Sequence, residues 1–181
     1  MRQKFSLEIK VPEGFEAEFH DEVLRIKKGE QTLERQIGLD KADVKIEGDS
    51  IKLIRDKANK KNIAIVKSIA AHINNMIRGL GNQYVYTLEV CNVHFPMTVR
   101  VDKDKLLINN FLGEKINRVA NILSDVEVEI KGNRITVSSR DIEKAGQTAA
   151  NIEKAAKVSK KDRRVFQDGI FIVEKPGAIY G

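Results

Sequence analysis

The stretch "VKIEGDSIKL", residues 44–53, sets the architecture of this chain because it is written twice. "VEIKGNRITV", residues 128–137, lies 84 positions further on and places its apolar residues and its glycine at the same points. Self-similarity at a fixed offset is the signature of a duplicated unit. We therefore predict two tandem modules of similar size, residues 1–80 and residues 81–181.

Each copy of the repeat has the pattern of a β-hairpin, with apolar residues alternating on both sides of a glycine-containing turn. After each hairpin the apolar period changes from two to about 3.6, which predicts helices over residues 62–79 and 145–156. Gly79 is expected to end the first helix and Asp141 to cap the second. Further strands are expected over residues 15–20, 23–27, 31–36, 82–93, 97–101 and 105–109. The predicted fold class is α+β, with a mainly antiparallel sheet and one covering helix in each module.

The composition indicates a folded, basic protein. The 181 residues include 32 basic and 26 acidic side chains, and 41% of the chain is hydrophobic, which excludes an intrinsically disordered chain. The net charge of +6 favours an anionic partner. Cys91 is the single cysteine, so no intramolecular disulfide can form. The chain has neither an apolar run of membrane-spanning length nor a signal-peptide pattern, and we expect a cytoplasmic protein without a membrane partner.

Catalytic and metal-binding patterns are weak in this sequence. Cys91 and His94 could be read as the pair of a thiol enzyme, but a separation of three residues along a strand places side chains on opposite faces. Three scattered histidines and one cysteine do not have the spacing of a zinc site. The acidic stretch from Glu13 to Glu22 alternates with apolar residues, as on the solvent face of a strand. We predict no enzymatic activity, no metal and no cofactor, and interpret Cys91 as a small core residue.

Basic residues are equally numerous in the two modules, but they cluster most densely in the second. Six basic groups lie between Lys154 and Arg164 against one acid, Asp162. One interpretation is a solvated helix end, where cations meet the negative end of the helix dipole. The other is a surface for phosphate groups, because the segment lies between a helix and the apolar run Ile170–Val173, which we expect to be a buried strand. A weaker patch occupies the equivalent joint of the first module, at Lys52, Arg55, Lys57, Lys60 and Lys61.

Three motifs carry a resemblance to a known family. "HFPMTV" (94–99), "NNFLGEKINRV" (109–119) and "VSKKDRRVFQDGIFIVEK" (158–175), in this order, resemble the large-subunit ribosomal protein six family in its archaeal and eukaryotic branch. The resemblance covers essentially the whole chain, including the duplication, and the short C-terminal tail is similar to archaeal members. It implies two tandem α+β modules, no catalysis and no cofactor. It also implies that the second module makes most of the contacts with large-subunit ribosomal RNA, close to the sarcin-ricin loop.

The resemblance also implies which residues bind RNA and which partners lie nearby. The predicted RNA-binding residues are Asn109, Asn110, Lys115, Arg118, Lys157, Lys160, Lys161, Arg163 and Arg164. Phe166, Gly169 and the strand that follows would form the scaffold behind them. Neighbouring ribosomal proteins and the translation factors that dock nearby are the expected protein partners. The alternatives are a stand-alone RNA-binding adaptor and the thiol enzyme described above.

Overall fold

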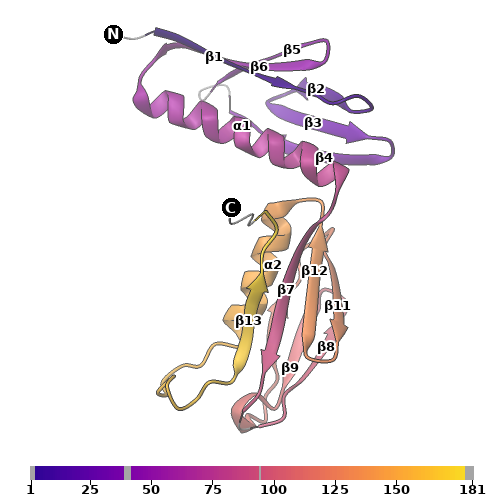
Figure 1. The fold of residues 1–181 in the computed structure, drawn as a ribbon, viewed down its shortest axis with the longest axis vertical. Helices are drawn as coiled ribbons and strands as arrows, with labels where there is room; N and C mark the ends of the chain where they lie inside the picture. The colour runs from indigo at the N-terminus through magenta and orange to yellow at the C-terminus, as the bar shows by residue number, and fades with distance from the viewer. Residues whose placement is uncertain (1–2, 39–41, 94, 178–181) are drawn as a thin grey trace. The chain divides into compact units, whose positions relative to one another are not determined.

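The computed structural model describes residues 3–38, 42–93 and 95–177. The chain divides into two compact units, Met1–Asn82 and Gln83–Gly181. Each unit consists of antiparallel sheets and one helix, which confirms the predicted α+β class (Figure 1). Each unit also has its own cluster of buried apolar residues, so each helix covers the sheets of its own unit.

The first unit contains two three-stranded antiparallel sheets and one long helix. The sheets have the strand orders β1–β6–β5 and β2–β3–β4. The elements are β1 Gln3–Lys10, β2 Glu16–His20, β3 Val23–Lys28, β4 Gln31–Gln36, β5 Asp43–Glu47, β6 Ser50–Ala58 and α1 Lys60–Gly81. Strand β1 is not among the predicted strands, although its Phe5, Leu7 and Ile9 alternate toward the core. On β2 the acidic side chains Glu16 and Glu18 are exposed, as predicted.

Helix α1 forms where the apolar period changes, and it buries one face against the sheets. Its predicted apolar positions are all buried: Val66, Ile69, Ile73 and Ile77. The helix begins at the predicted change of pattern, where the Asn59 side chain accepts a hydrogen bond from the Asn62 backbone N–H at 2.9 Å. The prediction that Gly79 ends the helix is wrong, because α1 continues to Gly81. Gly79 is itself buried, so the packing of the last turn outweighs the roughly 1 kcal/mol cost of an internal glycine.

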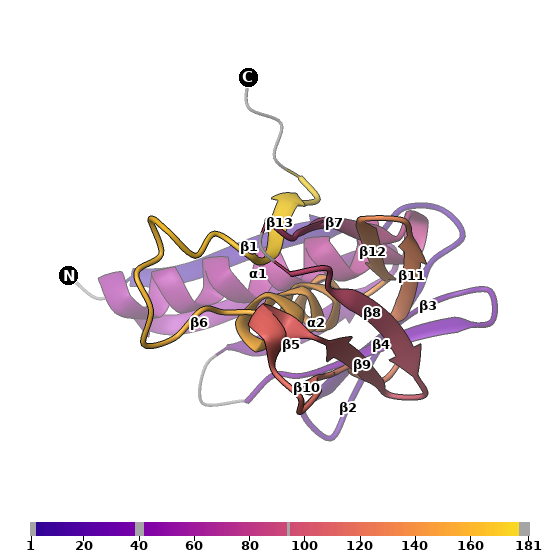
Figure 2. The same cartoon turned by 90° about the horizontal axis from the view of Figure 1, so that it is seen from below.

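The second unit has a four-stranded and a three-stranded antiparallel sheet. The strand orders are β11–β12–β7–β13 and β10–β9–β8, and the second of these can be followed in Figure 2. The elements are β7 Tyr84–Cys91, β8 Thr98–Asp102, β9 Lys105–Asn109, the short 3-10 helix η1 Phe111–Gly113, β10 Arg118–Asn121, β11 Glu127–Lys131, β12 Arg134–Ser139, α2 Ile142–Ala155 and β13 Gly169–Glu174. Helix η1 lies within residues 109–119 and β10 begins there, where the sequence pattern predicts only a turn.

The repeat is visible in the sheet topology. The order β1–β6–β5 of the first unit corresponds to β7–β12–β11 of the second, so the strand β13 is an addition at the free edge of β7. It pairs with β7 in antiparallel register, Gly169 opposite Cys91. The prediction of a wholly buried strand over 170–173 is wrong in part, because Ile170 is buried while Val173 is 50% exposed. An edge strand with one face toward the core alternates, whereas a fully buried one does not.

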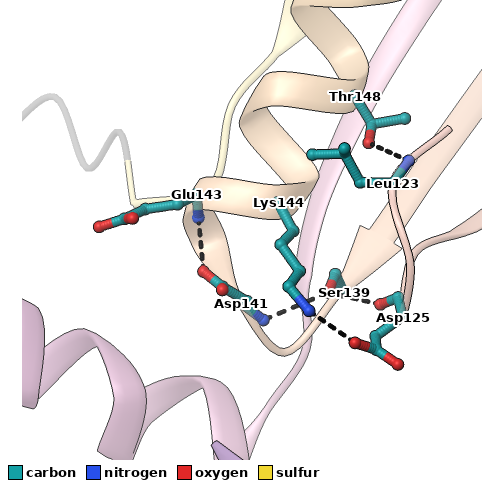
Figure 3. Close-up of polar contacts among 7 residues, drawn as sticks. All are labelled: Leu123, Asp125, Ser139, Asp141, Glu143, Lys144 and Thr148. Carbon is teal, nitrogen blue, oxygen red and sulfur yellow. Dashed lines mark hydrogen bonds and ion pairs between the residues drawn. The ribbon is translucent and has the colours of Figure 1, made fainter. Parts of the chain in front are cut away.

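The N-terminal end of α2 is fixed by a polar network (Figure 3). The Asp141 side chain accepts a hydrogen bond from the Glu143 backbone N–H at 2.8 Å, which confirms Asp141 as the predicted N-cap. The Ser139 hydroxyl donates to the carbonyl of Asp125 at 2.7 Å, and the Lys144 ammonium lies 2.6 Å from the carboxylate of the same aspartate. These contacts join the start of α2 to the turn before β11. They hold the helix whose other end carries the basic segment.

Candidate nucleic-acid interface

The basic segment connects the end of α2 to β13 and has a defined internal structure. Its turn is organised by Asp162, whose carboxylate accepts hydrogen bonds from the backbone N–H of Arg164 at 3.0 Å and from its guanidinium at 3.2 Å. The Asp162 carbonyl accepts from the backbone N–H of Phe166 at 2.9 Å. The hydrogen bonds from Arg164 lower the pKa of Asp162 below its usual value, so the carboxylate is ionised at neutral pH. One acid therefore shapes the turn that displays the surrounding cations.

The cations of the basic segment point away from the core. All six predicted basic side chains are exposed: Lys154, Lys157, Lys160, Lys161, Arg163 and Arg164. The Lys161 ammonium lies 4.6 Å from the centre of the Phe166 ring, a cation–π contact that fixes its direction. Lys160 has a left-handed backbone, with φ of 57°. A left-handed lysine is uncommon and marks a backbone conformation that the surrounding structure imposes.

The segment 109–119 lies in a second strained turn. Asn110, Leu112 and Gly113 have φ values of 57°, 50° and 77°. Positive φ costs little at glycine and asparagine but is unfavourable at leucine. The Asn110 side-chain amide donates to the Pro96 carbonyl at 2.9 Å, which holds the turn against the preceding loop. Strain of this kind is concentrated at binding sites, where the rest of the fold supplies the energy to maintain it.

Arg118 joins this turn to the end of α2. Its Nε and Nη2 donate to the two carboxylate oxygens of Glu114 at 2.8 and 2.7 Å. Its Nη1 donates to the carbonyls of Ala155 and Lys157 at 3.0 and 2.8 Å, where α2 ends and the basic segment begins. The guanidinium lies 4.0 Å from the centre of the Phe111 ring, and the side chain is only 22% exposed. Four of the five N–H donors of the guanidinium are thus used within the protein.

The strained turn and the basic segment meet at Arg118, whose guanidinium also pairs with Glu114. The pKa of Glu114 is lowered mainly by its hydrogen bonds with Arg118, and the positive charge of Lys161 lowers it further. Arg118 of the strained turn also hydrogen-bonds the Lys157 carbonyl of the basic segment, so the two predicted motifs lie next to each other. Sequence reasoning selected the cations and missed the acids that hold them, Glu114 and Asp162. The separation of four residues between Glu114 and Arg118 gave no signal, because that spacing pairs side chains on a helix and residues 114–117 form a turn before β10.

The far end of the basic segment is fixed by a buried acid. The Asp168 side chain, in a residue only 3% exposed, accepts hydrogen bonds from the backbone N–H of Val93 at 3.0 Å and of Phe95 at 3.4 Å. Arg118 fixes the near end through the carbonyls at the end of α2. The segment is therefore anchored at both ends and does not behave as a free loop.

The remaining predicted residues occupy different environments. Lys115 is exposed on the turn between η1 and β10. Asn109 is half-buried at the end of β9, and its side-chain carbonyl oxygen is buried without a hydrogen-bond partner among the described residues. Of the four predicted residues in this motif, Lys115 presents a freely exposed charge. Asn110 and Arg118 are engaged in contacts that shape the surface.

The basic patch of the first unit is partly neutralised. The Lys52 ammonium lies 2.5 Å from the carboxylate of Glu47. This hydrogen bond lowers the pKa of Glu47 and raises that of Lys52, so both remain charged and paired at neutral pH. Lys60 and Lys61 are exposed in the first turn of α1, and the side chain of Lys57 lies outside the described part of the chain. Cations at a helix N-terminus oppose its dipole, and no counterpart of the anchored basic segment is seen in residues 3–38 and 42–82.

The arrangement around Cys91 does not favour thiol chemistry. Cys91 was predicted to be a small core residue, and it is half-buried. Burial raises the pKa of its thiol, and the negative charges of Glu89 and Asp168 raise it further, which keeps the thiol neutral at pH 7. His94, the other member of the suspected pair, lies outside the described residues. No group of metal-binding side chains occurs in the described part of the chain, and none of its helices has the length and apolarity needed to cross a membrane.

Fold and site together define a basic, duplicated α+β protein with a cation-bearing surface held by buried contacts in its second unit. Comparison with known proteins identifies the family to which a protein of this class belongs. Residues 95–169 match the family described as Ribosomal protein L6. Three archaeal proteins, each described as large ribosomal subunit protein uL6, are similar over almost the whole chain. The identity is 39% for Haloarcula marismortui, covering 94% of this chain and 96% of the relative. It is 37% for Methanococcus vannielii, covering 95% and 94%, and 42% for Methanothrix thermoacetophila, covering 91% and 94%.

The chain therefore belongs to the ribosomal protein L6 family, the uL6 proteins of the large ribosomal subunit. This confirms the family inferred from the three sequence motifs. As a member of this family the chain is a structural ribosomal protein and not an enzyme.

Proposed function

We propose that this protein binds large-subunit ribosomal RNA through the second unit, with the surface formed by the turn 109–118 and the segment 157–164 as the principal contact. In the subunit it would lie near the sarcin-ricin loop and the region where translation factors dock, as the family resemblance implies. Neighbouring ribosomal proteins would complete its surroundings. The observation that carries this proposal is that Arg118 joins the two motifs, through its pair with Glu114 and its hydrogen bond to the Lys157 carbonyl.

Charge and exposure support a division of roles among the predicted residues. The residues proposed to contact phosphate are Lys115, Lys157, Lys160, Lys161, Arg163 and Arg164, all of which are exposed. Arg164 keeps a side chain that is 91% exposed even while it contacts Asp162, so its outer N–H groups can still reach a phosphate. Asn109, Asn110 and Arg118 would act mainly by holding the backbone of the turn. Anchoring at both ends reduces the ordering cost that a flexible basic loop would incur on binding.

The proposal predicts a salt-sensitive, RNA-specific interaction. The double substitution Arg163→Ala and Arg164→Ala should weaken binding to transcribed large-subunit rRNA about tenfold or more. It should also reduce the salt dependence of the binding constant by roughly 0.7–0.9 for each phosphate group that the variant no longer binds. The melting temperature should stay nearly constant, since both side chains are exposed. The matched control is Lys60→Ala with Lys61→Ala in the first unit, which removes two exposed cations elsewhere.

Binding specificity separates this function from a stand-alone RNA adaptor. A filter-binding comparison should show strong preference for one folded element of large-subunit rRNA over unrelated RNAs of the same length. Equal affinity for all of them, together with absence of the protein from purified large subunits, would favour the adaptor. An equal decrease of affinity in the Arg163/Arg164 variant and in the Lys60/Lys61 control would contradict the assignment of this surface.

A further inference from the structure

A cavity of about 680 Å³ lies between the basic segment, the end of α2 and strands β7 and β13. This volume falls within the range of about 300–1,000 Å³ that is usual for small-ligand sites. Phosphate binding by exposed cations does not require a cavity. The cavity is lined in part by cations of the basic segment, and its lining indicates which ligand it could hold.

The lining combines apolar and aromatic walls with a cationic opening. Its buried members include Ala156, Val158 and Ile170, and Phe166 and Phe171 also line it. The exposed cations Lys154, Lys157 and Arg163 belong to the same lining, so they lie toward solvent. An apolar, aromatic interior with positive charge at its mouth matches a flat aromatic group attached to a phosphate chain. Unpaired RNA bases are recognised in this way, by stacking on aromatic rings while the backbone contacts Arg and Lys.

The lining also offers a hydrogen-bond acceptor to a base. The half-buried Glu153 lines the cavity, and one of its carboxylate oxygens accepts from the Ile172 backbone N–H at 3.3 Å. A carboxylate has about four lone-pair positions, so capacity remains for a donor from a ligand. Every unpaired RNA base carries such a donor, an exocyclic amino group in adenine, cytosine and guanine and a ring N–H in guanine and uracil.

We propose that this cavity receives one unpaired base of the bound RNA, while Lys154, Lys157 and Arg163 contact the phosphates on either side of it. The inference rests on the proposed rRNA-binding function and adds a base-recognition site to a surface that phosphate contacts alone would leave insensitive to sequence. A protein side chain is the competing occupant, because an aromatic residue of a neighbour could fill the same walls.

Cys91 provides a test that leaves the amino-acid sequence unchanged. It is the single cysteine and it lines the cavity. Reaction of the full-length protein with N-phenylmaleimide at about pH 7.5, where maleimides modify thiols in preference to lysine amines, places an aromatic ring in the cavity. Reaction with methyl methanethiosulfonate adds only a methylthio group and is the matched control. The phenyl adduct should bind large-subunit rRNA about tenfold more weakly with an unchanged salt slope, and the methylthio protein should bind normally.

A second measurement works on the RNA and does not depend on the adduct. Probing of the rRNA with dimethyl sulfate for adenine and cytosine, and with a carbodiimide for uracil and guanine, should identify one unpaired base that the unmodified protein protects. Replacing that nucleotide by an abasic one in a synthetic rRNA fragment should weaken binding to the unmodified protein about tenfold. The same replacement should have almost no effect on the phenyl adduct, because the base has no cavity left to enter.

The outcomes distinguish failure of the proposed base site from failure of the proposed rRNA-binding function. Independent, additive effects of the adduct and the abasic site would overturn the base site, as would normal rRNA binding by the phenyl adduct. An adduct that binds rRNA normally but fails to enter the large subunit would overturn it in favour of a protein occupant. The underlying rRNA function is judged separately, by the salt slope and the affinity of the Arg163/Arg164 variant.

Discussion

Replacing Arg118 by alanine tests whether this residue holds the RNA-binding surface together or contacts RNA itself. Its two hydrogen bonds to the carbonyls at the end of α2 are worth about 1 kcal/mol each. Its pair with Glu114, whose side chain is 41% exposed, contributes roughly 0.5–1 kcal/mol after screening by solvent. Removal of all these interactions should destabilise the second unit by about 3 kcal/mol. For a unit of this size the transition should move down by roughly 10–20 °C.

The effect on RNA should differ from that of removing an exposed cation. Without Arg118 the basic segment loses its anchor at Lys157, and binding must restore the order that the free protein no longer has. We expect affinity for large-subunit rRNA to fall about tenfold at a temperature where the variant is folded, while the salt slope stays the same. Arg118→Lys keeps the charge but cannot bridge Glu114 and both carbonyls at once, so it should behave like the alanine variant.

The assays are differential scanning calorimetry and filter binding over a range of salt concentrations. Hydrogen exchange of peptides from β7 and β12 assigns the shifted transition to the second unit. The reasoning would be refuted by an Arg118→Ala protein that melts normally and binds rRNA with a salt slope reduced by roughly 0.7–0.9. That result would make Arg118 a direct phosphate contact, as the sequence motif taken by itself suggests.

Three further predictions follow from single contacts. The pKa of Glu114 is lowered in the folded state. The contribution of this carboxylate to stability is therefore complete above its ordinary pKa of 4.5 and is lost as pH falls through the folded value. Glu114→Gln should make thermal stability between about pH 6 and pH 3 less pH-dependent, by less than about 1 kcal/mol. Gly113→Ala should destabilise the second unit by about 1–2 kcal/mol in urea unfolding, because φ is 77° and the added methyl would lie 3.4 Å from the Phe95 ring. Lys52→Met should change rRNA affinity less than twofold in filter binding, since this ammonium is already paired with Glu47; a tenfold decrease would show that the first unit also binds the RNA.

Local patterns in the amino-acid sequence predicted the duplicated α+β architecture, although not the strands β1 and β10. The duplicated hairpins, the change of apolar period that begins each helix, and the N-cap at Asp141 all appear where the pattern places them. Such features depend on residues a few positions apart, whose spacing directly encodes the side of a strand or helix that each one occupies. The segments that bear the candidate RNA-binding cations could be found in the same way, from charge density and from the family motifs.

The arrangement of the site depends on contacts between residues far apart in the chain. Arg118 meets Lys157 across 39 positions, and Asp168 meets Val93 across 75, and no periodicity relates such pairs. Strand β13 pairs with β7 only because the folded sheet offers a free edge there. The same long-range packing directs the Arg118 guanidinium to the carbonyl of Ala155 and encloses the cavity beside Cys91. A side chain's partners are set by the fold as a whole, because burial and hydrogen bonding act through space and not along the chain.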